Sequence, residues 1–232
     1  MSAWPASLKS TIMAHITLQQ IKDSIEIKTY IERAAKTLNV IGYTEHGYQH
    51  VGIVSKVAGD LLVDLGYDAH AVELARIAGW MHDIGNVINR IDHAQSGAVM
   101  AFRILDKMGM PAEDVAEIIA AIGNHDESTA FPVSAISAAL IIADKTDVRR
   151  SRANTRAEQY DIHDRVNYAV LKNTTRLDKE EKMFVQEIVI DTEIASIMDY
   201  FEIYMTRLLL SRRAAEHLGI RFSLTVNGTK LC

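Results

Sequence analysis

The chain is poor in the features that mark several classes of protein. Its only cysteine is Cys232, so it cannot close an internal disulfide, and an oxidising compartment is not implied. Its longest apolar run, Ala138–Ala143, is too short to span a bilayer. The chain does not start with a basic region followed by an apolar run, so no signal peptide is expected. Together these absences predict a cytoplasmic protein with no membrane partner.

The chain also lacks an excess of positive charge. Its 25 Lys and Arg residues stand against 30 Asp and Glu residues, which gives a formal net charge of -5. A nucleic-acid-binding surface usually needs a basic stripe, so nucleic acid is not expected as a partner. A small phosphorylated substrate held by a local cluster of Lys and Arg remains compatible with this charge. Because 232 residues can bury a full core without a structural metal, any bound metal is expected to be functional.

Apolar residues recur at helical spacing up to about residue 148. Thr44 is the expected N-cap of the second helix and Gly66 its end, while Pro111 suits the first turn of the fifth. No repeat and no Pro/Gly/Ser-rich linker interrupts the pattern. The expected helices, of which the first is one helix or two in series, cover residues 18–38, 44–66, 68–85, 92–108, 111–124 and 132–148.

The pattern changes after about residue 155, where β-branched residues become frequent. The expected elements are a short helix, two strands, a long helix and a third strand followed by the turn signal Asn227–Gly228. They cover Arg156–Asn167, Tyr168–Thr175, Met183–Ile190, Thr192–His217 and Arg221–Val226.

The sequence therefore predicts a mostly α protein with a small C-terminal α+β extension, made of a short antiparallel sheet and a long helix. We expect an N-terminal helical segment over 1–43, a helical metal-binding core over 44–155 and the extension over 156–232, packed on the core.

The strongest chemical signal is the pair His82–Asp83 at the end of an apolar helix. A buried, charged carboxylate is costly unless it is paired or bound to a metal. Adjacent residues on a helix point about 100° apart, so this pair can hold one ion from two directions. Imidazole and carboxylate together suit Mn, Fe, Mg, Co or Zn. The pair thus predicts a divalent-metal site of undetermined metal.

Four further residues stand where helices could deliver them to the same site. His50 lies near the start of the second expected helix, and His93 lies at the start of the fourth. His125 closes the fifth, and Asp144 follows the apolar run Ile141–Ala143. Each residue alone also fits another role: a core histidine bonded to backbone, a surface histidine at a helix end, or a helix N-cap.

As an ordered set, these residues resemble the HD-domain superfamily, metal-dependent phosphohydrolases named after a His-Asp pair. His50, the His82–Asp83 doublet and Asp144 match its pattern, and His93 and His125 fall where binuclear members carry two further histidines. The local sequences Met81-His-Asp-Ile-Gly85 and Ile142-Ala-Asp-Lys145 match as well. The resemblance covers roughly residues 44–152.

The resemblance implies a helical bundle that binds one or two divalent metals. By analogy, the first metal is held by His50, His82, Asp83 and Asp144. Asp83 would then bridge to a second metal held by His93 and His125. Asp126 stands where the cyclic-dinucleotide phosphodiesterase branch tends to have a second histidine, which argues against that branch.

The implied activity is hydrolysis of a phosphate ester by metal-activated water, with a nucleotide among the candidate substrates. No serine lies in a GxSxG setting and the cysteine is terminal, so the sequence offers no protein nucleophile. Asp83 and Lys145 are the candidate catalytic residues. Two other functions stay open: a di-iron oxygenase of the same fold, and a nucleotide sensor without catalysis.

Basic residues follow Asp144 and are candidates for substrate binding. Lys145, Arg149 and Arg152 are spaced i, i+4, i+7 and share one face if the helix continues. We hypothesise that Lys145 and Arg149 bind the substrate phosphate and that Asn86 adds a neutral polar contact. A solvated helix face is an equally good interpretation of the basic cluster.

Other polar residues receive weaker assignments. His46 is expected in the frayed first turn of the second helix and not among the ligands. Asp126–Glu127 either orients a ligand or forms a solvated turn. The long helix is expected to expose Arg207 and Arg212–Arg213, and to use its Met and aromatic stripe in the core or in a homodimer interface.

Overall fold

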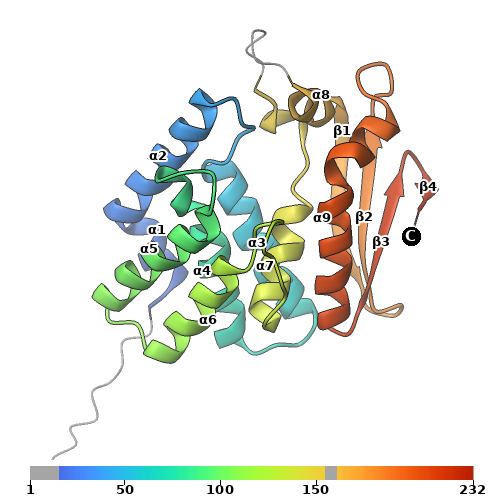
Figure 1. Cartoon of the computed structure of the whole chain (residues 1–232). Helices are drawn as coiled ribbons and strands as arrows, with labels where there is room; N and C mark the ends of the chain where they lie inside the picture. The colour runs from blue at the N-terminus through green and yellow to red at the C-terminus, as the bar shows by residue number, and fades with distance from the viewer. Residues whose placement is uncertain (1–15, 155–160, 232) are drawn as a thin grey trace, which may run out of the picture.

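The helices form a bundle, and a long helix and a small sheet lie beside it (Figure 1). The computed structural model describes residues 16–154 and 161–231. The bundle contains α1 (Leu18–Asp23), α2 (Ile25–Val40), α3 (Tyr48–Asp64), α4 (Ala69–Met81), α5 (His93–Lys107), α6 (Ala112–Gly123) and α7 (Ala135–Lys145), with the 3-10 turns η1 (Ile84–Val87) and η2 (Arg150–Arg152). The C-terminal part contains α8 (Ile162–Ala169), β1 (Val170–Asp178), β2 (Met183–Ile190), α9 (Ile197–His217), β3 (Arg221–Val226) and β4 (Thr229–Lys230).

Side-chain caps set several helix starts. Asp68 accepts a hydrogen bond from the backbone of Ala71 at the start of α4, and Ser134 caps α7 in the same way. Ser196 and Asp199 form a capping box, so α9 starts at Ile197, later than predicted. These caps supply hydrogen-bond acceptors for amides that the first helical turn leaves unpaired.

The prediction that Thr44 caps the second helix is wrong. The N-cap of α3 is Gly47, and Thr44 lies in the segment before it. There the amide of Glu45 donates to the carbonyl of Arg152, 2.8 Å away, and the ring of His46 donates to the carbonyl of Thr44. This segment therefore bonds to η2 and to itself, and it stays outside the helix.

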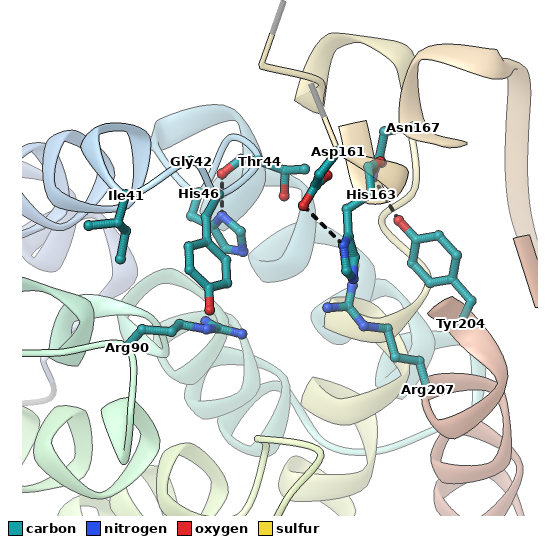
Figure 2. A pocket seen from close by; sticks show the side chains of 11 residues that line it. Ile41, Gly42, Thr44, His46, Arg90, Asp161, His163, Asn167, Tyr204 and Arg207 are labelled. Atoms are coloured by element: carbon teal, nitrogen blue, oxygen red, sulfur yellow. Dashed lines mark hydrogen bonds and ion pairs between the residues drawn. The ribbon is translucent and has the colours of Figure 1, made fainter. Parts of the chain in front are cut away.

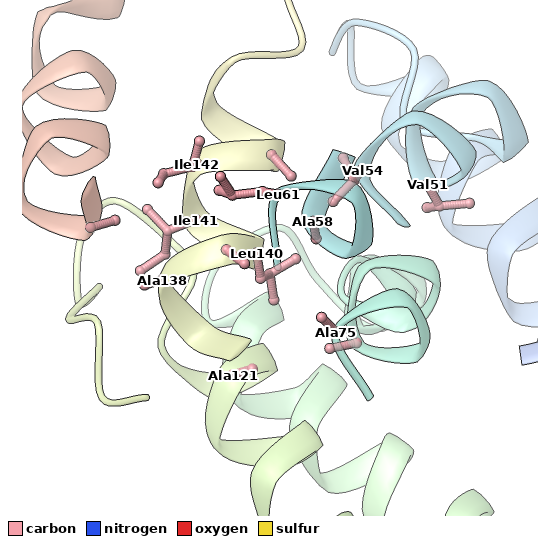
Figure 3. Close-up of a cluster of buried hydrophobic side chains, with 14 of the residues drawn as sticks. Val51, Val54, Ala58, Leu61, Ala75, Ala121, Ala138, Leu140, Ile141 and Ile142 are labelled. Atoms are coloured by element: carbon pink, nitrogen blue, oxygen red, sulfur yellow. The ribbon is translucent and has the colours of Figure 1, made fainter. Parts of the chain in front are cut away.

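The core lies where α3, α4 and α7 meet, and aliphatic side chains such as Val54, Leu61 and Leu140 fill it (Figure 3). Gly79 lets α3 and α4 approach closely, because a Cβ at that position would lie 2.7 Å from the Cα of Ser55. This close approach brings His50 of α3 near His82 at the end of α4. The apolar packing thus sets the spacing of the polar site.

The sheet has the order β1-β2-β3-β4 and is mixed. The β1/β2 and β3/β4 pairs are antiparallel, whereas β2 and β3 run parallel. The prediction of an antiparallel sheet is therefore wrong for one pair. The reason is that α9 crosses from the end of β2 to the start of β3, as parallel strands require. Asn227 and Gly228, both with positive φ, form the predicted hairpin turn.

Helix α9 lies between α7 and the sheet (Figure 1). Tyr204 of the predicted stripe is buried, which confirms a core role for that part, while Met198 and Met205 of the same stripe are exposed. Tyr200 and Leu210, outside the predicted stripe, are buried as well. The fold class, mostly α with a small C-terminal α+β extension, is confirmed.

The predicted helix over Arg156–Asn167 corresponds to α8 from Ile162 onward, and its residues 156–160 lie outside the described part, as does Cys232. No helix in the described ranges combines the length and the apolar character needed to cross a membrane.

Candidate metal centre

Four histidines from four helices meet at one buried point. His50 lies in the first turn of α3, His82 caps the end of α4, His93 begins α5 and His125 follows α6. The Nε2 atoms of His50 and His82 are 3.2 Å apart, and those of His93 and His125 are 3.1 Å apart. The four rings therefore form two pairs.

Asp83 lies between the two histidine pairs. Its Oδ2 is 3.6 Å from Nε2 of His50 and 3.5 Å from Nε2 of His82. Its Oδ1 is 3.5 Å from Nε2 of His93 and 3.9 Å from Nε2 of His125. One carboxylate thus presents one oxygen to each pair, which is the arrangement that a bridging ligand requires.

Asp144 completes the first histidine pair from α7. Its Oδ1 is 3.3 Å from Nε2 of His50 and 3.8 Å from Nε2 of His82. The structure therefore brings together all six predicted ligand residues. They fall into three overlapping groups whose donor atoms lie within 4.8 Å of one another, namely His50, His82 and Asp83; His82, His125 and Asp144; and Asp83, His93 and His125.

The hydrogen bonds fix which ring nitrogens face the centre. Nδ1 of His82, His93 and His125 lies within 3.0 Å of a backbone carbonyl, which can only accept, so each Nδ1 carries the proton. In the neutral ring each Nε2 then carries a lone pair, and these lone pairs point at one another. Asp83 Oδ2 is buried and has no hydrogen-bond partner within residues 16–154 and 161–231. Inward lone pairs and an unpaired carboxylate oxygen fit a divalent cation.

The local environment keeps these donors in their metal-binding forms. Burial lowers the pKa of His82, and burial together with nearby cations lowers the pKa of His125 to about 3, so both rings are neutral at pH 7. Burial opposes ionisation of Asp83, yet the surrounding imidazoles outweigh it and hold the pKa of that carboxyl well below its usual range. At Asp144 burial is likewise outweighed, chiefly by Lys145, and the pKa is again well below normal.

A family model described as HD domain matches residues 47–203, which is more than half of the chain. The chain belongs to the HD-domain family. The predicted resemblance is thereby confirmed. HD domains bind divalent metals, and this membership together with the donor set supports a metal-dependent hydrolase.

This HD domain protein is similar to two further proteins. The uncharacterized protein MJ1020 of Methanocaldococcus jannaschii is 25% identical over 176 residues, which are 66% of this chain and 67% of that protein. A crystal structure of a predicted HD superfamily hydrolase from an uncultured Thermotogales bacterium is 28% identical, with a TM-score of 0.43. That match covers 53% of this chain and 67% of the other.

Asp147 orients His50 from the side of the ring that faces away from the centre. The sequence did not predict this role. Its Oδ2 lies 2.7 Å from Nδ1 of His50, which directs the Nε2 of that ring to the centre. Burial raises the pKa of Asp147, but Arg152 and His50 outweigh it and bring the pKa down to about 2. The available signal was its position three residues after Asp144, just beyond the end of the same apolar helix.

Asp147→Asn is expected to weaken metal binding by about 10- to 100-fold, because the amide no longer fixes the tautomer and angle of His50. Metal titration in a competing chelator measures the change. Asp60→Asn is the matched control, since the ion pairs of Asp60 in the described part of the chain are with Lys56 and Arg76, away from the centre. Equal metal affinity in the two variants contradicts a role for Asp147 in orienting His50.

Asn86 is fully buried behind the centre. Its amide nitrogen donates to the backbone carbonyl of Asp83 at 3.0 Å and to Asp83 Oδ1 at 2.9 Å. This geometry orients the carboxylate and differs from the substrate contact that the sequence suggested.

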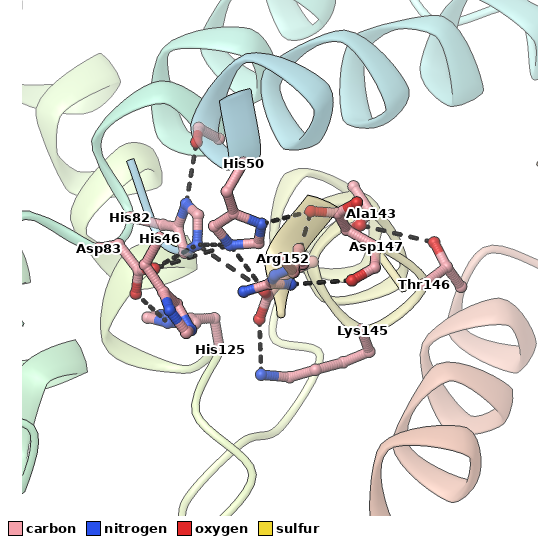
Figure 4. A network of polar contacts seen from close by, with 12 residues as sticks. His46, His50, His82, Asp83, His125, Ala143, Lys145, Thr146, Asp147 and Arg152 are labelled. Atoms are coloured by element: carbon pink, nitrogen blue, oxygen red, sulfur yellow. Dashed lines mark hydrogen bonds and ion pairs between the residues drawn. The ribbon is translucent and has the colours of Figure 1, made fainter. Parts of the chain in front are cut away.

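The sequence placed Lys145, Arg149 and Arg152 on one helix face on the condition that the helix continues, and it does not continue, because α7 ends at Lys145. Lys145 points to the centre, with Nζ 2.6 Å from Asp144 Oδ2. The guanidinium of Arg149 instead bonds to Asp147 Oδ1 at 3.0 Å and to a carboxylate oxygen of Glu45 at 2.6 Å. Arg152 is buried and donates to the carbonyl of Asp147 at 2.8 Å. Figure 4 shows Arg152 within this network and Lys145 at its edge.

The prediction that α9 exposes Arg207 is also wrong. Its side chain is 23% exposed, against 55% for Arg212 of the same helix. Its Nε lies 2.7 Å from Glu127 Oε1, which is also 3.2 Å from Nζ of Lys145. Glu127 therefore joins the C-terminal helix to the centre. The missed signal is the spacing from Tyr204, because three residues along a helix keep Arg207 on the buried side.

A cavity of about 260 Å³ opens beside the metal centre. It lies between the segment before α3, α8 and α9, and its lining includes Tyr43, Thr44 and Tyr204 (Figure 2). A smaller cavity reaches the candidate ligands Asp83, His93, His125 and Asp144, and the two cavities share three lining residues, His46, Arg90 and Arg207. A molecule in the larger cavity thus lies next to the centre.

His46 lines both cavities and is buried, but it belongs to none of the three ligand groups. It lies in the segment before α3 and not in the first helical turn, where the sequence had placed it.

Proposed function

We propose that this HD domain is a metal-dependent phosphohydrolase that cleaves a phosphate ester in a small phosphorylated molecule. The observation that carries the proposal is the position of Asp83, with one oxygen toward each histidine pair. This supports two cation positions that share one carboxylate. The proposed ligands are His50, His82, Asp83 and Asp144 for one ion and Asp83, His93 and His125 for the other.

Bound in this centre, divalent cations supply Lewis acidity toward a phosphoryl oxygen and lower the pKa of water toward neutrality. The protein residues orient the donors. Asn86 and Asp147 hold Asp83 and His50, as described above. The ammonium of Lys145 donates a hydrogen bond to Asp144 Oδ2, so Asp144 Oδ1 is the oxygen that faces the histidines. Arg149 and Arg152 hold Asp147 in turn.

The adjoining cavity suits the part of the substrate that does not react. Its volume of about 260 Å³ lies just below the range of roughly 300–1,000 Å³ for small-molecule sites. The lining is mixed, with the rings of Tyr43 and Tyr204 beside the polar Thr44 and Asn167. These features support a small polar organic group, and nucleoside monophosphates are the first compounds to test.

The proposal is tested by loading the purified protein with Mn, Mg or Co and screening phosphorylated metabolites for phosphate release. We expect turnover of at least one phosphate ester under anaerobic conditions, lost on chelation. Oxygen consumption by an iron-loaded sample without phosphate release would favour the oxygenase alternative. Nucleotide binding without turnover by any metal would favour a sensor.

Lys145→Ala is expected to raise KM about tenfold or more while metal content changes little, because we propose that the ammonium contacts the substrate phosphate. The tenfold follows from the roughly 1.5 kcal/mol of a charged hydrogen bond. Steady-state kinetics and elemental analysis measure the two effects. Lys56→Ala, at an exposed residue of α3, is the control. Metal loss that parallels the activity loss would make Lys145 a support of Asp144 only.

A further inference from the structure

Two arginines reach into the cavity beside the metal centre from opposite sides (Figure 2). Arg90 comes from the segment between η1 and α5, within the ligand-bearing part of the chain. Arg207 comes from α9, in the C-terminal extension. Both side chains line the substrate cavity and also the smaller cavity that contains the metal ligands. They therefore lie at the passage between the larger and the smaller cavity.

Each guanidinium lies over a tyrosine ring. The Cζ atom of Arg90 is 5.4 Å from the ring centre of Tyr43, and that of Arg207 is 5.2 Å from the ring centre of Tyr204. Such stacking restricts the orientation of a guanidinium while leaving its N–H groups free to donate. The two tyrosines thus hold the planar groups in place at the passage.

Among the described residues, both guanidiniums use only part of their hydrogen-bonding capacity. Arg207 contacts Glu127 through Nε. Neither of its terminal nitrogens makes a hydrogen bond to another described residue. Arg90 makes only long contacts: 3.4 Å to Asn86 Oδ1, 3.4 Å to His93 Nε2 and 4.0 Å to Asp126 Oδ1. Lys145 has close acidic neighbours, because Asp144 and Glu127 lie 2.6 and 3.2 Å from its Nζ, and one of its three N–H donors remains for the phosphate.

We propose that Arg90 and Arg207 form a clamp that binds the phosphoryl group of the substrate. A guanidinium presents parallel N–H donors that match the spacing of two phosphate oxygens, and a site for an anion beside buried metal ligands needs such donors. The identity of the anion as substrate rests on the proposed phosphohydrolase function. The clamp gives the C-terminal extension a role, since α9 supplies one half of it.

The test is the affinity of the full-length, Mg-loaded protein for inorganic phosphate, measured by calorimetry. Arg90→Gln and Arg207→Gln are each expected to weaken binding by about 10- to 100-fold, the range for one or two charge-assisted hydrogen bonds. Arg212→Gln, on the exposed side of α9, is the matched control and should bind as the wild type does. Phosphate affinity within twofold of the wild type in both clamp variants overturns the proposal.

Arg207 also neutralises Glu127, so a second variant separates the two roles. Arg207→Lys keeps a positive charge beside Glu127 but lacks the planar fork. We expect Arg207→Lys to keep the wild-type melting temperature and metal content and still to lose at least fivefold in phosphate affinity. Full recovery of the affinity by lysine would show that Arg207 only supports Glu127, which overturns its place in the clamp.

Failure of the clamp and failure of the proposed function give different results. If the wild type hydrolyses a phosphate ester and the arginine variants match it in phosphate affinity and KM, the clamp is wrong and the function stands. If the wild type binds phosphate in an arginine-dependent way but hydrolyses no ester, the clamp stands and the function is wrong.

Discussion

Asp83→Ala is expected to abolish bound divalent metal and to lower turnover on the order of a thousandfold. Both histidine pairs depend on this carboxylate, because its Oδ2 faces His50 and His82 while its Oδ1 faces the other pair. Its removal takes a charged ligand from both proposed ions at once. The activity estimate corresponds to about 4 kcal/mol of lost transition-state stabilisation, within the several kcal/mol that metal catalysis supplies.

Elemental analysis and turnover measure this prediction, and far-UV circular dichroism checks that the helices persist. Asp106→Ala is the matched control, since Asp106 is exposed on α5. The control should retain metal and activity. An Asp83→Ala protein that stays folded and keeps both would contradict the assignment of Asp83 as the shared ligand.

Gly85→Ala is expected to lower the free energy of unfolding by about 3 kcal/mol and to disrupt the site of His93. A Cβ at Gly85 would lie 2.0 Å from the carbonyl oxygen of His93 and 2.5 Å from the backbone nitrogen of Gly97. Both atoms belong to the backbone of α5, so the helix must move away from η1. Overpacking of this kind typically costs 1–3 kcal/mol, and a clash with backbone places Gly85 at the upper end.

Urea unfolding in excess chelator measures this cost without a contribution from metal binding. Gly52→Ala is the control, because a Cβ there meets only the ring of Trp80 at an ordinary 3.8 Å, within a helix that alanine favours. We expect Gly52→Ala to be neutral or stabilising. Equal stability of the two variants would show that η1 and α5 are not packed as tightly as described.

The ligand set could be predicted because its residues interrupt apolar patterns. Asp144 follows Ile141–Ala143, and the pair His82–Asp83 ends a helix whose neighbours are almost all apolar. A polar side chain in such a position is either costly or functional, so the pattern itself carries the information. The order of the same residues along the chain then matched one family.

The residues that orient the candidate ligands could not be predicted, because their positions depend on where the helices end. Arg149 does not share a helix face with Lys145, because α7 ends at Lys145. Asp147 reaches His50 across 97 positions of sequence, which no local spacing reveals. Thr44 suited an N-cap by residue type, but the hydrogen bond between Glu45 and Arg152 draws its segment away from α3. Tertiary contacts overrode local preference in each case.

The role of α9 was hidden for a similar reason. Arginines on a long amphipathic helix are usually solvated, and Arg212 behaves in this way. Arg207 differs because α9 packs against α7, which carries Lys145, and so meets Glu127. The parallel pairing of β2 with β3, which follows from the α9 crossover, was likewise invisible in the strand pattern.

Anomalous diffraction from crystals grown with Mn²⁺ tests the central claim most directly. We expect manganese peaks within bonding distance of Asp83, one on the side of His50 and His82 and one on the side of His93 and His125. Manganese bound only elsewhere on the protein, with these six side chains free of metal, would contradict it.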